Sequence, residues 1–365
     1  DTSFYIYLEG ENQQLATFIQ DISFSLALMM LEEGLEKAKI LEAYFRLAYG
    51  TDSPVYPFAV STLAQFYFML GDDVNGLEWV MKSYELELQQ LGTDQSASAD
   101  QWQLLSLMLQ AYDRQEEATE AMDAAVTASL EEGLPTEQTI EMLARSAEMH
   151  LALDRSKEGM AQFEKARNWC NAMDSTSDAI CVQTMLDYVL YLQADFRYRD
   201  AATLLASIQE KALRSGAAAA WTYSFAETAM SLNQTELALQ SYQQVYEQPV
   251  DTLDGGYWKK KAAAALARYH TDAGNIATAE RLWLEAAQLA ATGTDSADYY
   301  SMLDDLAGFY AKVGRYEKAI AYATRVSEYY FREVADTSSA IDNLINADLK
   351  LETALNGALT MGRYL

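Results

Sequence analysis

The sequence predicts an all-α protein, an α-solenoid of about eight antiparallel helix pairs stacked one after another. Half of the 365 residues are hydrophobic, and only four prolines interrupt the chain. Apolar side chains recur with the spacing of amphipathic helices, and a unit of about 40 residues returns along most of the chain. Because one such unit cannot bury its own apolar face, units of this length stack into an array.

The clearest copy of the unit spans residues 300–326 and reads YSMLDDLAGFYAKVGRYEKAIAYATRV. Its first half has apolar residues at positions i, i+3, i+4 and i+7, which is one face of a helix. Gly314 then breaks the pattern, and a second amphipathic helix follows. The inner positions of the two helices are Leu303, Leu306, Ala307, Tyr310, Ala319, Ala323 and Val326.

A small residue marks the second helix of every unit. The eight positions are Gly34, Gly76, Ala118, Gly159, Ala201, Ala238, Ala279 and Ala319, at intervals of 42, 42, 41, 42, 37, 41 and 40 residues. Two antiparallel helices approach closely only where a side chain is small. The series therefore predicts where each helix pair packs.

The third unit resembles the tetratricopeptide repeat (TPR) family. The family pattern W-x2-L-G-x2-Y…A-x3-F is partly matched by Trp102, Leu105, Ser106, Leu109, Ala118 and Met122. The longer period is similar to the variety of about 42 residues found in kinesin light chains and many bacterial proteins, and the turns at 49–54 and 91–95 match its Leu-Gly-x-Asp ending. The resemblance implies a right-handed superhelix whose first helices line a concave binding face.

The resemblance covers residues 15–335, which we expect to form the repeat array. Residues 1–14 are aromatic and partly β-like, and we expect an N-terminal arm or cap there. Residues 336–365 are predicted to form a C-terminal capping helix over the last repeat. The alternative is a lead-out helix toward a signalling or membrane module.

The charge of the chain restricts its partners. A net charge of −28 argues against nucleic acid, because phosphate binding requires clustered Lys and Arg. It also disfavours an anionic membrane surface. No apolar run reaches the roughly 18 residues that span a bilayer, so we expect no membrane insertion by this segment. The charge either keeps an elongated protein soluble or attracts a basic partner.

Residues suited to catalysis are scarce. The two histidines, His150 and His270, fall in helix-packing positions three repeats apart and cannot share a metal or a triad. No nucleophile elbow, phosphate loop or metal motif occurs. The sequence therefore predicts a protein that is not an enzyme and has no cofactor and no metal.

The two cysteines lie near each other in the predicted fold. Cys170 ends one second helix and Cys181 begins the next first helix, across a short loop. These helices should be antiparallel neighbours, which allows a disulfide. We favour a reduced pair that serves as small core residues. The disulfide is the alternative, and it would indicate a periplasmic or other extracytoplasmic location rather than the cytoplasm.

Side chains on the first helices that avoid the packing positions are the candidate ligand contacts. They are Phe58, Gln65, Phe68, Met69, Gln103, Leu107, Glu148, Leu190, Tyr223, Glu227, Lys261 and Arg268. We expect the binding energy to concentrate in Phe58, Phe68 and Met69. Alternatively, these three residues pack beneath the N-terminal arm.

The predicted function is a non-catalytic scaffold that binds a protein or peptide on the concave face. The alternative is the ligand-sensing region of a bacterial signalling receptor, such as a histidine kinase or cyclase, whose membrane and output modules lie outside this sequence. A third possibility is the recognition part of a larger enzyme. The sequence leaves the oligomeric state and the identity of the ligand open.

Overall fold

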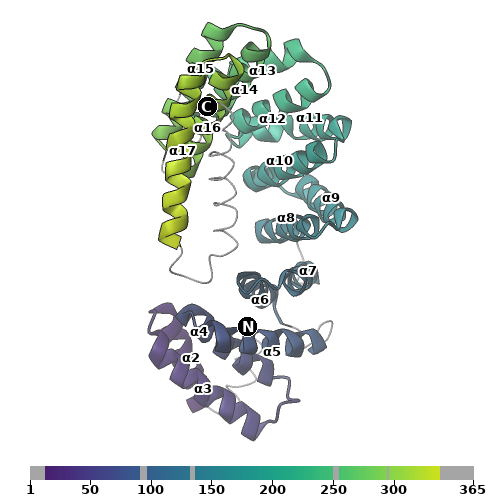
Figure 1. Cartoon of the computed structure of the whole chain (residues 1–365). Coiled ribbons are helices and arrows are strands. Elements are labelled where there is room, and N and C mark those ends of the chain that lie inside the picture. Colours follow the sequence, from purple (N-terminus) through teal and green to yellow (C-terminus); the bar gives the residue numbers. More distant parts are fainter. Residues whose placement is uncertain (1–12, 91–96, 132–135, 250–254, 294–295, 338–365) are drawn as a thin grey trace. The chain divides into compact units, whose positions relative to one another are not determined.

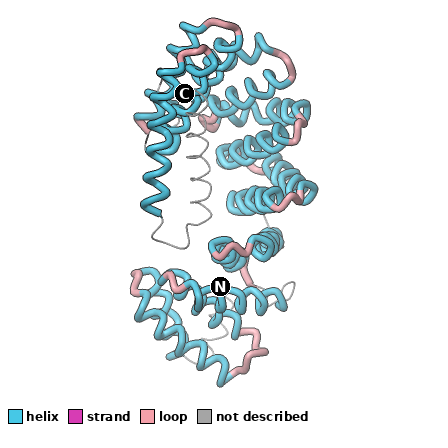
Figure 2. The backbone as a smooth tube through the Cα atoms, in the orientation of Figure 1, coloured by secondary structure: helices cyan, strands magenta, loops and turns pink. Residues whose placement is uncertain are grey.

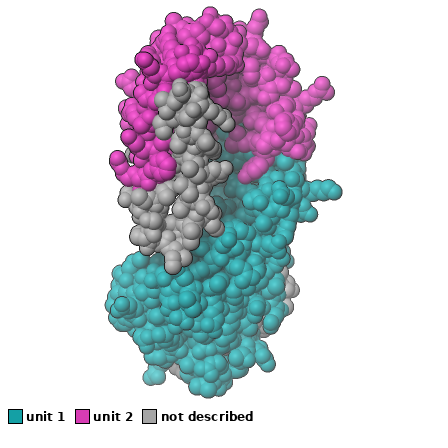
Figure 3. All heavy atoms as spheres, in the orientation of Figure 1, with its two compact units in different colours: residues 1–188 teal, residues 189–365 magenta. Residues whose placement is uncertain are grey.

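The computed structural model describes residues 13–90, 97–131, 136–249, 255–293 and 296–337 (Figure 1). Across these ranges the chain forms sixteen α-helices and one short 3-10 helix, η1 (Ser175–Ser177), and no strand (Figure 2). It divides into two compact units, residues 1–188 and 189–365 (Figure 3). No helix in the described ranges is long and apolar enough to cross a membrane.

In chain order the helices fall into eight pairs, as predicted. Four pairs lie in unit 1, and the fifth begins with α10, which crosses the division between the units. The pairs are α2 (Gln13–Ala27) and α3 (Leu31–Ala48), α4 (Tyr56–Leu70) and α5 (Asp73–Gln90), α6 (Ala99–Ala111) and α7 (Gln115–Glu131), α8 (Glu137–Ala152) and α9 (Ser156–Ala172), α10 (Asp178–Ala194) and α11 (Tyr198–Arg214), α12 (Ala218–Ser231) and α13 (Thr235–Tyr246), α14 (Gly255–Asp272) and α15 (Ile276–Ala291), and α16 (Ser296–Lys312) and α17 (Tyr316–Thr337).

The turn inside each pair contains one residue in the left-handed conformation. These residues are Met29, Gly71, Asp113, Asp154, Phe196, Asn233, Gly274 and Gly314, with φ between 55° and 78°. Each lies five residues before the small residue of the following helix, so the two series have the same intervals. A left-handed residue ends a helix and reverses the chain. The predicted repeat frame is therefore confirmed in all eight pairs.

The eight small residues are all buried, as the packing argument requires. A Cβ atom on Gly159 would lie 2.8 Å from the carbonyl oxygen of Ala147 and 2.7 Å from Cγ of Leu151, both on the partner helix. A Cβ atom on Gly34 would meet the ring of Phe66. Real Cβ atoms do not come this close to their neighbours, so these positions require glycine.

Each unit has its own hydrophobic core. In unit 1 the first two pairs bury Phe45, Tyr56 and Phe66 completely. In unit 2 the alanine-rich centre of α14 packs against Trp283 of α15 and neighbouring helices. Small side chains on α14 allow the flanking helices to approach closely.

Three expectations fall outside the described residues. These are the arm at residues 1–12, the turn at 91–95 and the helix predicted beyond residue 337. The predicted boundaries of the cap, the array and the C-terminal helix remain predictions.

Candidate binding face

The first helices of unit 1 present a pocket of about 550 Å³ between α6 and α8, with one contribution from α7. This volume lies within the range of ligand-binding clefts, about 300–1,000 Å³. We call it the amide pocket. Its lining is Asp100, Gln103, Leu104, Leu107, Gln110, Met122, Glu141 and Arg145.

Two glutamine amides on α6 are held in place by α8. Arg145 donates a hydrogen bond to Oε1 of Gln110 at 2.9 Å, and Gln138 donates one to Oε1 of Gln103 at 3.4 Å. Gln138 also donates to Asp100 at 2.5 Å. The amide oxygens are therefore occupied, whereas the two NH₂ groups make no hydrogen bond within the described part of the chain. Such groups donate to peptide carbonyl oxygens.

An apolar side chain stands between these amides. Leu107 lies between Gln103 and Gln110 on α6, and 53% of its surface is exposed. Both Gln103 and Leu107 were predicted contacts, and the structure brings them to one pocket. An exposed apolar side chain beside a few placed polar groups in a concave surface has the composition of a ligand site.

A second, smaller pocket of about 140 Å³ lies between α2, α3 and α4, with one contribution from α6, and we call it the apolar pocket. Its apolar lining is Ile19, Ile22, Leu26, Leu41, Phe58 and Phe66. Its polar lining is Ser23, Ser61, Thr62, Gln65 and Gln101. Two of the predicted contacts, Phe58 and Gln65, thus belong to this pocket.

A cavity of about 10 Å³, enough for about one water molecule, shares lining residues with both pockets. It shares Ser61, Gln65 and Gln101 with the apolar pocket and Leu104 with the amide pocket. The buried carboxyl of Glu87 also lines it, and burial raises the pKa of this group to about 7. The three spaces therefore follow one another along the first helices of unit 1.

Phe68 and Met69 lie outside both pockets. Phe68 is half-buried, and its ring makes an edge contact with the ring of Tyr112 at the end of α6, 5.9 Å between centroids. Met69 is exposed. We expected Phe68 to be an exposed anchor, but in the structure it packs between two repeats.

Glu148, the remaining predicted contact of unit 1, lies near a second carboxylate, Asp187, which was not predicted. Burial, and secondly the charge of Glu148 on α8, raise the pKa of Asp187 on α10 to about 6. Gln183 donates a hydrogen bond to Asp187 at 3.0 Å. Glu148 is thus near another acid. Leu190, also on α10 but within unit 2, is exposed.

In unit 2 the predicted contacts gather around α12 and α14. The ammonium of Lys261 lies 5.0 Å from the ring centroid of Tyr257 and 5.9 Å from that of Tyr223. Glu227 accepts a hydrogen bond from Tyr242 at 2.5 Å. Burial and the Glu227 carboxylate raise the pKa of Tyr223. Arg268, the last predicted contact, is exposed on α14.

Sequence reasoning missed a partly buried polar network in unit 1. Asp123 on α7 accepts hydrogen bonds from Ser146 at 2.5 Å and from Gln162 at 3.0 Å, and it lies 2.8 Å from Nε2 of His150. His150 is buried, as expected of a packing residue. Its partner could not be found from spacing, because Asp123 lies 27 residues away. Arg145 was missed as well, although it follows Glu141 by one helical turn.

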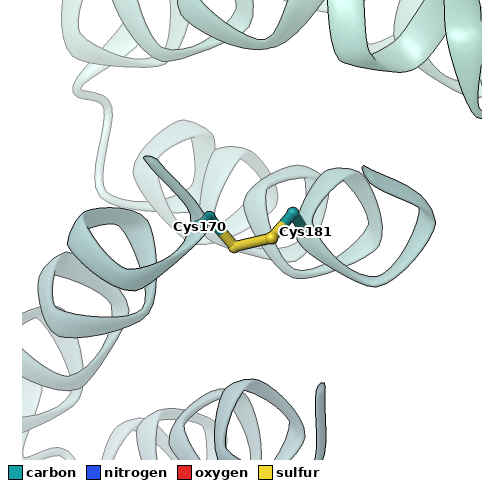
Figure 4. The surroundings of a disulfide bond; sticks show 2 residues. All are labelled: Cys170 and Cys181. Carbon is teal, nitrogen blue, oxygen red and sulfur yellow. A yellow bond between two sulfur atoms is a disulfide. The ribbon is translucent and has the colours of Figure 1, made fainter. Parts of the chain in front are cut away.

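The two cysteines form a disulfide (Figure 4). The Cα atoms of Cys170 on α9 and Cys181 on α10 are 5.5 Å apart, a normal disulfide distance. Ile140 packs against the bond. The neighbouring position of the two helices was anticipated. From the sequence we favoured reduced cysteines, and the structure shows that this expectation was wrong.

Comparison with known proteins adds information about the fold. No protein-family model matches the chain, and no curated protein matches its sequence. The apo form of RapI superposes with a TM-score of 0.52 at 11% identity, covering 95% of this chain and 98% of that chain. The C-terminal part of a TPR repeat-containing protein from Cytophaga hutchinsonii gives a TM-score of 0.49 at 14% identity, covering 79% and 98%. The apo form of the quorum sensor NprR from B. thuringiensis gives 0.44 at 14% identity, covering 98% and 93%.

At such identities the similarity to RapI concerns the fold alone. Together with the repeat frame, it defines the class of protein: the chain has the fold of tetratricopeptide-type helical repeat proteins. The more specific resemblance to the kinesin-light-chain variety stays a prediction.

Proposed function

We propose that this protein is a non-catalytic scaffold that binds a peptide, or an extended segment of a partner protein, along the first helices of unit 1. The observation that carries the proposal is the amide pocket, where an exposed leucine stands between two glutamine amides. A peptide offers backbone carbonyl oxygens for the amides and side chains for the apolar surface.

The charges of the pocket favour a neutral or basic segment. Asp100 and Glu141 line the amide pocket, and among the described residues Arg145 is the one basic side chain in its lining. The whole chain has a net charge of −28, which repels acidic ligands and speeds the encounter with basic ones. We therefore infer a ligand without an excess of carboxylates.

The test is selection from a random peptide display library, performed in parallel on three forms of the protein. Wild type should enrich a peptide family, and Leu107→Asp should not, because a carboxylate replaces the apolar contact. Leu213→Asp is the matched control, since Leu213 is also exposed but lies on α11 of unit 2. Enrichment of the same peptides by Leu107→Asp would refute the site.

A second function, the sensing region of a signalling receptor, is favoured by one observation. Disulfides persist in oxidising compartments, where the ligand-sensing parts of membrane receptors are located. Alkylation of the protein in native cells before any reduction, followed by mass spectrometry, tests the compartment. Free thiols at Cys170 and Cys181 would remove the support for this alternative.

A further inference from the structure

The apolar pocket has the size of one large side chain. Its volume is about 140 Å³, and an apolar cavity of about 150 Å³ binds benzene. Drug-sized ligands need larger clefts, of at least about 300 Å³. The pocket therefore suits a single Leu, Met or Phe side chain rather than a complete small molecule.

The hydroxyl groups in the lining do not require a polar ligand. Thr62 and Ser61 on α4 both donate to the carbonyl oxygen of Phe58, at 2.7 Å and 3.0 Å, and Ser23 on α2 donates to that of Ile19 at 3.1 Å. Each hydroxyl proton is thus used within its own helix. These hydroxyls therefore have no proton left to donate to a ligand.

Two amides in the lining have free hydrogen-bonding capacity. The side chain of Gln65 makes no hydrogen bond within the described ranges. Gln101 accepts from the backbone N–H of Ser98 at 2.9 Å through Oε1, but its NH₂ group has no partner there. Apolar walls beside unpartnered amides match a side chain attached to a peptide backbone, because the backbone supplies both donors and acceptors.

The pocket also continues the proposed binding face. Gln65 and Gln101 line both the apolar pocket and the 10 Å³ cavity, and Leu104 lines both that cavity and the amide pocket. We propose that the apolar pocket receives one Leu, Met or Phe side chain of the peptide whose neighbouring residues occupy the amide pocket. This inference rests on the proposed function and specifies the ligand.

The first arm of the test uses toluene, which needs no peptide. A ligand that binds only the folded state raises the melting temperature. Toluene should therefore raise the melting temperature of wild type, and Thr62→Leu should abolish this effect by filling the pocket. Thr127→Leu is the matched control, because Thr127 also donates to the carbonyl oxygen four residues earlier, at 2.9 Å, but is exposed on α7.

The second arm uses the peptides enriched by wild type. They should share one Leu, Met or Phe, and Thr62→Leu should weaken their binding about ten- to hundredfold, the ratio expected from burying one such side chain. Gln65→Ala should weaken peptide binding while the toluene effect remains, which separates the amide contact from the pocket itself.

Each remaining outcome contradicts the inference. If toluene leaves the melting temperature of wild type unchanged, or acts equally on Thr62→Leu, the apolar pocket is not a binding site. If the peptides bind Thr62→Leu as tightly as wild type, the pocket does not hold their side chain, although the proposed function stands. If wild type enriches no peptide, the proposed function fails and this inference with it, even where the toluene effect persists.

Discussion

The contribution of the left-handed turn residue to stability can be tested with two glycines of unit 2. Gly274 lies in the turn between α14 and α15 with φ of 78°, whereas Gly308 lies inside α16. A Cβ atom at either position would meet nothing within 4 Å. Replacement by alanine therefore changes the backbone energy without creating a clash, and the two substitutions differ only in local conformation.

The expected effects have opposite signs. A side chain in the left-handed region costs about 1–2 kcal/mol, partly offset by the lower entropy of the unfolded chain, so Gly274→Ala should destabilise by about 1 kcal/mol. Gly308→Ala should stabilise by up to about 1 kcal/mol, because alanine is the better helix former. Gly274→Asn should destabilise the protein less than Gly274→Ala, since asparagine tolerates this conformation.

The measurement is urea denaturation followed by circular dichroism on all four proteins. The reasoning requires a difference of about 2 kcal/mol in unfolding free energy between the two alanine variants. If both variants shift in the same direction, the turn conformation does not determine stability at Gly274. The left-handed residue of each repeat would then mark the turn without contributing to stability.

Three further predictions concern unit 1. Glu87→Gln should leave stability unchanged near pH 4.5 but raise it by about 3 kcal/mol at pH 8. The reason is that the pKa of the wild-type carboxyl is raised from 4.5 to about 7, so this group destabilises the fold as it ionises. Denaturation at both pH values checks this, with the exposed Glu85→Gln on the same helix as the control for the loss of one carboxylate. Glu148→Gln should lower the pKa of Asp187 from about 6, because it removes a nearby negative charge. Carbon NMR titration measures this, and an unchanged pKa would show that burial alone raises it. Gly159→Ala should destabilise by about 1–3 kcal/mol by crowding the facing helix, and calorimetry showing equal or higher stability would contradict the close packing.

The repeat frame was predictable because its determinants are local. A helix face is encoded by spacing within about ten residues, and the small residue follows the turn by a constant five positions. Several of the left-handed residues were less accessible. Glycine, asparagine and aspartate favour this conformation, but Met29 and Phe196 do not, so only the structure of their repeats identifies them.

The candidate site was predictable only in part, for a geometric reason. Spacing predicted that Gln103 and Leu107 lie away from the packing positions of α6, and both line the amide pocket. Which of the predicted side chains pack against each other depends on helices about 40 residues apart. Phe68 illustrates this limit, because its partner Tyr112 belongs to the next repeat and no local pattern connects them.

The disulfide also affects how the chain unfolds. In a solenoid each repeat contacts only its neighbours, so stability resembles a sum of local terms and individual repeats can open separately. The bond between Cys170 and Cys181 joins the second helix of the fourth repeat to the first helix of the fifth, across 11 positions of sequence. These two helices cannot separate while the bond is intact, so α9 and α10 should exchange their amide hydrogens as one cooperative unit. Reduction should allow the two helices to exchange independently. The redox state of Cys170 and Cys181 would then determine how cooperatively this part of the array opens.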